Sequence, residues 1–117
     1  LMHTGDALPL AGPDTPMGEA LLTISQKGFG VVGVTENNGN LSGIVTDGDL
    51  RRHMDGLLGF TAGAVMTTSP ETIGVDALAE EALARMNARK ITCLFVTDAA
   101  RPVGLIHIHD CLRIGLG

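Results

Sequence analysis

The second half of the chain repeats the first, and this repeat limits the possible folds more than any other feature of the sequence. The segment PMGEALLTISQKGFGVVGVTE (Pro16–Glu36) matches LAEEALARMNARKITCLFVTD (Leu78–Asp98) at a shift of 62 residues. Farther along, GIVTDGDLRRHM (43–54) has the same outline as GLIHIHDCLRIG (104–115) at a shift of 61. Two copies of one structural unit are therefore predicted.

Each copy begins with a segment whose apolar residues have helical spacing. They follow an i, i+3, i+4, i+7 pattern, which places them on one helix face: Met17, Ala20, Leu21 and Ile24 in the first copy, and Ala79, Ala82, Leu83 and Met86 in the second. Thr15 before Pro16 predicts the first helix start, with a hydroxyl cap and a proline in the first turn. Asp76 is the candidate cap in the second copy.

Two apolar runs follow each helix and are predicted to pair as antiparallel strands. The runs are 30–35 and 41–45 in the first copy, and 92–97 and 102–106 in the second. Asn38-Gly39 separates the first two runs and favours a hairpin, because both residue types tolerate positive φ. The second turn, DAAR, is one residue shorter, and this accounts for the change in shift.

A short helix is predicted to close each copy, near 47–54 and near 108–114. The predicted order is helix, strand, strand, helix, twice, with 61–76 as an irregular connector. We therefore divide the sequence into repeat 1 (1–60) and repeat 2 (61–117). A chain of about 60 residues buries only about 60% of its unfolded surface, which is marginal for an independent fold.

The predicted fold is α+β, a pseudo-twofold pair of two small sheets, each flanked by helices. Since neither half is well stabilised alone, the two are expected to pack sheet to sheet and share one core. Such packing would leave two related clefts between the sheets, and a ligand is predicted to lie there.

Composition argues against several classes of protein. The chain has 117 residues, a net charge of -5, three Phe and no Trp or Tyr, so it lacks the basic stripe and stacking rings of nucleic-acid-binding proteins. No apolar run is long enough to span a membrane and no signal-peptide pattern is present, so we expect a cytoplasmic protein. Cys93 and Cys111 lie in apolar contexts without a CxxC partner and are predicted to be reduced core residues.

The motifs MTTSPETI, before the second helix, and GIVTDGDLRR, after the first hairpin, resemble tandem cystathionine-β-synthase (CBS) domains, the Bateman module. The resemblance covers essentially the whole chain. Together with MHTGDALPL (2–10) and VGLIHIHDCLRIGL (103–116), the sequence is similar to the C-terminal part of arabinose-5-phosphate isomerases of the KdsD/KpsF type. In that family an N-terminal sugar-isomerase (SIS) domain, absent from this chain, performs an aldose–ketose isomerisation.

The resemblance implies a nucleotide site in the first copy. The family signature, Gly, two apolar residues, Thr or Ser, two variable residues and Asp, is matched from Gly43 to Asp49. In family members that bind adenosine nucleotides, the hydroxyl approaches a phosphate and the carboxylate accepts from the ribose diol, roles that would fall to Thr46 and Asp49. A carboxylate can accept two hydroxyl donors at once in charge-assisted bonds, and N–H groups at a helix start favour an anion.

The second copy departs from this signature at its hydroxyl position. His107 replaces the Thr, whereas Asp110 keeps the ribose-binding position. An imidazole can still donate to an anion, and the replacement is compatible with a ligand other than an adenosine nucleotide. Arg52 and Arg113 hold equivalent positions in the two copies and are candidate phosphate or sugar-carboxylate contacts, since guanidinium groups bind such anions with two hydrogen bonds.

Each candidate residue also has a structural interpretation. Thr46, Asp47 and Asp49 could simply cap a helix and complement its dipole. Arg51, Arg52 and Arg113 could be solvated dipole complements; the list of such surface cations also includes Arg89 and Lys90. His107, His109 and Asp110 contain zinc-type ligands, but no third histidine is near in sequence, so no metal site is predicted.

The sequence contains no nucleophile–base motif, P-loop or dinucleotide fingerprint, so no catalysis is expected from this fragment. The resemblance implies a regulatory module that binds a nucleotide or nucleotide-sugar, such as CMP-Kdo, and controls an arabinose-5-phosphate isomerase of lipopolysaccharide or capsule biosynthesis. The implied partners are the SIS domain of the same parent chain and a second CBS pair in a homodimer. The alternative is an oligomerisation module with vestigial clefts.

Overall fold

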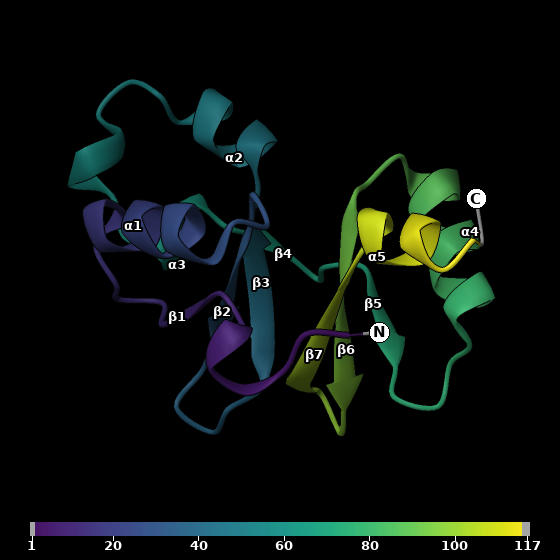
Figure 1. The fold of residues 1–117 in the computed structure, drawn as a ribbon. Helices are drawn as coiled ribbons and strands as arrows, with labels where there is room; N and C mark the ends of the chain where they lie inside the picture. Colours follow the sequence, from purple (N-terminus) through teal and green to yellow (C-terminus); the bar gives the residue numbers. More distant parts are fainter. Residues whose placement is uncertain (1, 116–117) are drawn as a thin grey trace. The chain divides into compact units, whose positions relative to one another are not determined.

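Two small mixed sheets, each covered by helices, account for most of the computed structural model, which describes residues 2–115 (Figure 1). The sheets belong to two units. One unit consists of Pro9–Pro70, called here the 9–70 unit, and the other joins residues 71–115 to residues 2–8, called here the C-terminal unit. The predicted α+β class with two small sheets is confirmed.

The 9–70 unit is built on a four-stranded sheet in the order β1-β2-β3-β4. β1 runs parallel to β2, and the other neighbours are antiparallel. α1 packs on this sheet, and α2 leaves the end of β3 (Figure 1). The elements are β1 (Leu10–Ala11), α1 (Met17–Lys27), β2 (Val32–Thr35), β3 (Leu41–Val45), α2 (Asp47–Arg52), the 3-10 helix η2 (Leu57–Gly59), α3 (Ala62–Val65) and β4 (Thr67–Thr68).

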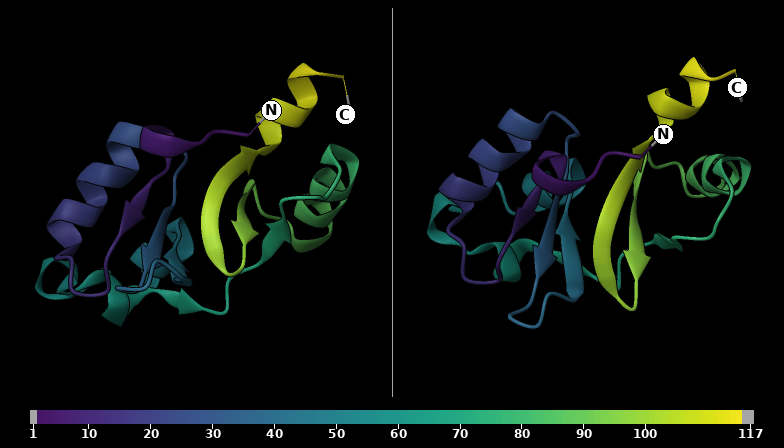
Figure 2. Two further views of the ribbon diagram at one scale, coloured as in Figure 1. Left: turned by 90° about the horizontal axis from the view of Figure 1, so that it is seen from below. Right: turned by 60° about the horizontal axis from the view of Figure 1, so that its bottom comes forward.

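The C-terminal unit repeats this plan with a three-stranded sheet in the order β5-β6-β7. β5 is parallel and β7 antiparallel to β6, and β7 runs directly into α5 (Figure 2). His3, from the N-terminus of the chain, forms an antiparallel bridge with Leu105 of β7. The elements are the 3-10 helix η1 (Gly5–Ala7), β5 (Thr72–Gly74), α4 (Ala79–Arg89), β6 (Cys93–Asp98), β7 (Arg101–His107) and α5 (Ile108–Arg113).

The predicted order of helix, strand, strand and helix is confirmed in both copies, but the predicted caps of the long helices are wrong. The N-cap of α1 is Pro16, and the Thr15 hydroxyl instead accepts a hydrogen bond from the backbone N–H of Gly12. The N-cap of α4 is Leu78, two residues after Asp76. In both helices the amphipathic face, which packs on the sheet, fixes the helix more strongly than a cap does.

The prediction of an irregular connector at 61–76 is also wrong. This segment contains α3, β4 and β5, and β4 and β5 belong to different sheets. Strands of two or three residues carry too little alternation to be recognised in a sequence. Their positions are set by the hydrogen bonds of neighbouring strands, which only the folded chain supplies.

Each unit has a buried hydrophobic cluster of its own. The cluster of the 9–70 unit contains Met17, Ala20, Val32, Val34, Val45, Ala62 and Val65. That of the C-terminal unit contains Ile73, Ala82, Met86, Leu94, Val96, Ile106 and Cys111. The apolar helix positions predicted from the repeat therefore face the sheet of their own unit.

The two units are divided differently from the two sequence repeats, 1–60 and 61–117. Residues 61–70 complete the sheet of the 9–70 unit through β4, and residues 2–8 belong to the C-terminal unit. The repeats thus describe the sequence, and the units describe where the chain packs. Within residues 2–115, none of the helices has the length and apolar character that crossing a membrane requires.

Candidate functional site

The predicted site of the first copy lies where β3 ends and α2 begins. Thr46 is the N-cap of α2 and has an extended backbone, so Asp49 falls at the third helical position. Gly43 of β3 lies against β4, where an added Cβ would come within 2.8 Å of the Thr67 backbone oxygen. The glycine of the signature therefore allows β4 to approach, and β4 brings Thr67 to Asp49.

Asp49 is 1% exposed and its carboxylate accepts four hydrogen bonds. Its Oδ2 accepts from the Thr46 backbone N–H at 2.9 Å and from the Thr46 hydroxyl at 3.1 Å. Its Oδ1 accepts from the Thr67 hydroxyl at 2.6 Å and from the Arg52 guanidinium. Four donors fill the lone-pair positions of one carboxylate, so Asp49 caps its helix and also joins α2 to β4.

The hydrogen bonds decide the charge state of Asp49. Burial by itself would raise the pKa of this carboxyl, because it disfavours the charged form. The hydrogen bonds from Thr67, Thr46 and Arg52 outweigh that effect, and the pKa of Asp49 is lowered below its ordinary value. Asp49 is thus a buried, ionised and fully bonded carboxylate.

The equivalent junction in the C-terminal unit lies between β7 and α5. His107 is the N-cap of α5, and Asp110 is 4% exposed. The Asp110 Oδ2 accepts from the His107 backbone N–H at 2.9 Å and lies 3.0 Å from the His3 Nε2, and its Oδ1 accepts from Arg113. His3 therefore takes the place that Thr67 occupies beside Asp49.

The two titratable groups of this junction have shifted pKa values. Burial by itself would raise the pKa of Asp110, but the His107 backbone N–H, His3 and Arg113 outweigh it and lower the pKa. The pKa of His107 is lowered, first by burial and then by the neighbouring His109. The Nδ1 of His107 accepts a hydrogen bond from the His109 backbone N–H at 3.1 Å, a bond that requires this nitrogen to be unprotonated.

Arg52 and Arg113 bond the two buried aspartates, whereas the other predicted surface cations do not. Arg52 and Arg113 bond Asp49 and Asp110 while their side chains remain 63% and 71% exposed. Arg51 forms an exposed ion pair with Asp47 on the same helix. Arg89 and Lys90 lie at the end of α4. Arg89 approaches Glu71, and Lys90 is the C-cap, with a left-handed backbone conformation.

The structure brings His107 and His109 together without forming a metal site. Their ring centroids are 4.6 Å apart, and His107 uses Nδ1 as the helix cap. No group of three or more His, Cys, Asp or Glu side chains within residues 2–115 is placed to hold a metal ion. Cys93 and Cys111 are free thiols, and burial raises the pKa of Cys93 to about 11, so Cys93 is unreactive at neutral pH.

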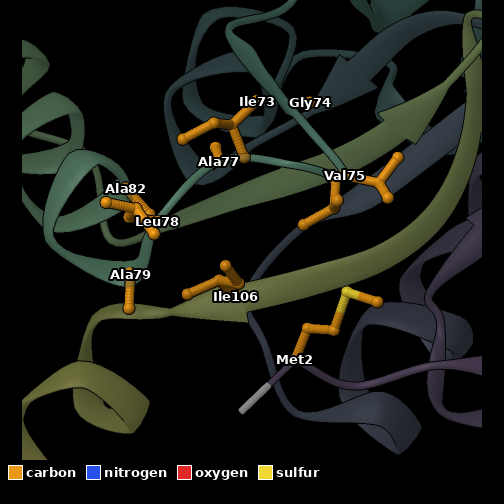
Figure 3. A pocket seen from close by; sticks show the side chains of 10 residues that line it. Met2, Ile73, Gly74, Val75, Ala77, Leu78, Ala79, Ala82 and Ile106 are labelled. Atoms are coloured by element: carbon orange, nitrogen blue, oxygen red, sulfur yellow. The ribbon is translucent and has the colours of Figure 1, made fainter.

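An apolar pocket with a volume of about 190 Å³ lies within the C-terminal unit (Figure 3). It is lined by the loop after β5, the start of α4 and the end of β7; the lining residues include Val75, Leu78, Ala79 and Ile106. Met2 also contributes its side chain to the wall (Figure 3). Ile106 immediately precedes His107, so the pocket wall and the polar junction are consecutive along β7, whose successive side chains point to opposite faces of the sheet.

Sequence reasoning from the signature missed Thr67, His3 and Met2. A signal was present: Met2-His3-Thr4 and Met66-Thr67-Thr68 share their Met and their last Thr at a shift of 64, just outside the aligned repeats. Each segment precedes a copy of the repeat, yet each lies against the sheet of the other copy. Which sheet each segment joins depends on the path of the folded chain. A comparison of the two repeats along the sequence does not contain this information.

Comparison with known proteins agrees with this architecture. The sequence profile of the CBS domain matches residues 4–56 and 62–117. CBSX2, a CBS-pair protein of Arabidopsis thaliana whose crystal structure was determined in complex with AMP, superposes with a TM-score of 0.83 at 25% identity, over 98% of this chain and 92% of that one.

Curated relatives extend the likeness to one group of enzymes. The chain is 42% identical over 120 residues to the arabinose 5-phosphate isomerase KdsD of Pseudomonas aeruginosa and 36% identical over 119 residues to KdsD of Escherichia coli K12. Each match covers 99% of this chain but only 37% and 36% of those relatives. The profile matches, the two sheets and the paired strand-to-helix junctions together show that this chain belongs to the CBS-domain family, as a tandem CBS pair.

Proposed function

We propose that this chain is a regulatory module that binds a nucleotide or nucleotide-sugar and that it controls an arabinose-5-phosphate isomerase. The catalytic SIS domain would lie in the same parent polypeptide, and the CBS pair itself would be non-catalytic. The likeness to KdsD proteins supports the choice of enzyme. The AMP complex of CBSX2 supports a nucleotide as the class of ligand. A cytoplasmic location, where nucleotides and free thiols are found, belongs to the same proposal.

The observation that carries the proposal is the apolar pocket whose Ile106 wall directly precedes the His107–Asp110 junction along the chain. A nucleotide has an apolar base, a ribose diol and an anionic phosphate. The pocket offers an apolar wall from Ala79, Leu78 and Ile106, and the adjoining junction offers a carboxylate with imidazole and guanidinium groups around it. The two surfaces have the chemistry that the two ends of a nucleotide require.

A ribose diol would bind to Asp110 by exchanging hydrogen-bond donors. Arg113 is largely exposed, so it can turn away from Asp110 and leave acceptor positions for the hydroxyls. The released guanidinium would then pair with the phosphate, for which its planar geometry is suited. We assign the same roles in the 9–70 unit to Asp49 and Arg52, with the Thr46 hydroxyl beside the phosphate.

The favoured ligand is a cytidine nucleotide-sugar such as CMP-Kdo, an end product of the pathway to lipopolysaccharide or capsule. Its sugar carboxylate adds a second anion to the phosphate. His107 and Arg113 would face these two anions, and the imidazole at the hydroxyl position separates this site from the adenosine-type signature. A ligand of this kind would regulate the parent enzyme only by binding one of its states more tightly than another.

The alternative is an oligomerisation module with vestigial sites, and two observations favour it. Both aspartates already accept hydrogen bonds from within the protein. In addition, large apolar side chains are exposed on both units; they include Leu22, Met54 and Leu58 in the 9–70 unit and Leu112 and Ile114 in the C-terminal unit. A homodimer would cover such side chains.

Thermal unfolding with added nucleotides separates these two functions. AMP, ATP, CMP and a CMP-sugar are tested with the wild type and with Ala79→Phe, which fills the pocket. Ala84→Phe, on an exposed position of the same helix, is the control. A ligand at a hundred times its dissociation constant should stabilise the wild type and the control by about 2.7 kcal/mol, and Ala79→Phe should lose that gain. If none of the four compounds raises the melting temperature, the sensing function is wrong.

A further inference from the structure

The N-terminal residues Met2 and His3 form what we call the strap, a segment that lies along the free edge of β7. The His3 backbone N–H donates to the Leu105 oxygen at 2.8 Å, and the Leu105 N–H donates to the His3 oxygen at 2.9 Å. An added Cβ on Gly104 would lie 3.3 Å from the His3 oxygen and closer still to the Met2 side chain. Gly104 therefore leaves the space that the strap occupies.

Both strap residues contact the proposed ligand site, one at each end. Met2, which is 40% exposed, lines the apolar pocket with its side chain directed toward Val75 (Figure 3). The Nε2 of His3 lies 3.0 Å from Asp110, the proposed ribose acceptor. The strap thus supplies a wall to the base pocket and a polar partner to the carboxylate, although it is far from both in sequence.

The equivalent segment of the 9–70 unit pairs with its sheet over one more position than the strap does. There β4 pairs with β3 at two positions, Thr67 with Ile44 and Thr68 with Gly43. The strap has a single bridge, between His3 and Leu105. Besides its two backbone hydrogen bonds to Leu105, the strap is held by its side chains, namely Met2 at the pocket and His3 at Asp110.

We propose that Met2 and His3 are ligand-site residues and that a nucleotide in the C-terminal unit holds the strap against β7. This inference rests on the proposed function. A base in the pocket would pack against Met2, so binding and docking of the strap stabilise each other. By thermodynamic reciprocity, the factor by which a bound nucleotide favours the docked strap equals the factor by which a docked strap favours nucleotide binding. Displacing the strap therefore weakens nucleotide binding. The strap would therefore couple the occupied site to the position of the N-terminal segment.

Amide hydrogen exchange, measured by NMR on the 117-residue chain without ligand, tests whether the side chain of His3 holds the strap against β7. The Leu105 amide bonds the strap, whereas Ile106 pairs with Leu94 of β6 and serves as an internal reference. His3→Ala should raise exchange at Leu105 roughly tenfold or more, the effect of losing one hydrogen bond to a charged group, with no change at Ile106. The control, His109→Ala, should change neither. Equal changes in the exchange rates of both amides, or no change at Leu105, would overturn the proposed role of His3 in holding the strap.

The same measurement with saturating AMP or CMP tests the coupling. We expect exchange at Leu105 to slow more than at Ile106, and Met2→Ala to raise the dissociation constant roughly tenfold because it removes the apolar contact of the Met2 side chain with the base. Met54→Ala, an exposed methionine of the other unit, should leave the dissociation constant unchanged. Binding that leaves Leu105 exchange and the Met2→Ala affinity unaltered overturns the strap alone. No binding by either nucleotide overturns the proposed function together with the strap.

Discussion

The two buried aspartates differ in the side chain that reaches each of them from outside its own helix. Asp49 accepts from the Thr67 hydroxyl, and Asp110 from the His3 imidazole. Both accept from a backbone N–H at the helix N-cap and from an arginine one turn later, but only Asp49 also accepts from the side chain of its N-cap residue, the Thr46 hydroxyl. At the residue scale each aspartate caps its helix and bonds a neighbouring segment, and it is also a candidate ligand contact. Substitutions must therefore be chosen to separate the structural role from ligand binding.

The aspartates should set the acid limit of stability. Their pKa values are lowered in the folded protein, so the stability they contribute is present above about pH 4 and is lost as the pH falls through the folded values. We expect Asp49→Asn and Asp110→Asn each to lower the free energy of unfolding at pH 7 by about 1–3 kcal/mol. In each variant the free energy of unfolding, measured with urea, should also fall less steeply as the pH is lowered into the acid range. Asp47→Asn, in an exposed ion pair, is the control and should cost less than about 1 kcal/mol.

His107 should make stability depend on pH in the mildly acidic range. Its folded pKa is lowered, so the unfolded chain binds the proton more readily, and stability falls as the pH drops from about 6.5 through the folded pKa. His107→Asn keeps an N-cap residue without the titration. Urea unfolding at pH 7 and pH 5 should show a smaller loss of free energy in this variant than in the wild type or His109→Asn. An equal loss in all three would contradict the role of His107.

At the scale of elements, the turns and short strands decide how each sheet is completed. The hairpin at Asn38-Gly39 is confirmed, with Gly39 at φ 88° and the Asn38 side chain accepting from the Asn40 N–H. In the second hairpin Ala99 and Ala100 both have positive φ, at 52° and 70°. This backbone conformation is costly for alanine, so the paired strands β6 and β7 impose it on the turn.

Replacing this strained pair should stabilise the protein. Ala99→Asn combined with Ala100→Gly provides the residues that a two-residue hairpin turn with positive φ prefers. We expect a gain of about 1 kcal/mol in the free energy of unfolding, measured with urea. Ala84→Gly, inside α4, should instead cost about 1 kcal/mol. A double variant no more stable than the wild type would show that the strands do not impose strain on the turn.

At the scale of the whole molecule, the chain exchanges its leading segments between units. Residues 2–8 belong to the unit that otherwise begins at Glu71, whereas β4, which leads into the second repeat, completes the sheet of the first. Each unit is therefore closed by a segment distant in sequence from at least part of its sheet. The stability of each unit depends on chain ends that a cut between the repeats would separate.

Deleting residues 1–8 should consequently weaken the C-terminal unit and spare the 9–70 unit. The loss includes two backbone hydrogen bonds to Leu105 and the His3–Asp110 contact, at about 1 kcal/mol for each bond, so roughly 3 kcal/mol. Amide exchange followed by NMR should accelerate in β7 and α5, with β2 and β3 unchanged. Faster exchange confined to the 9–70 unit would contradict the assignment of residues 2–8 to the C-terminal unit.

The sequence by itself determined the long helices, the paired strands and the closing helices of each copy, and only the tertiary structure decided the short strands and how the elements are joined. The i, i+3, i+4, i+7 pattern of α1 and α4, the paired apolar runs and the repeated signature all express local periodicity, which is written along the chain. The contacts of Thr67 with Asp49, of His3 with Asp110 and of Met2 with the pocket join residues 18 to more than 100 positions apart. Such contacts depend on which strand edge a segment reaches, and no local pattern records that choice.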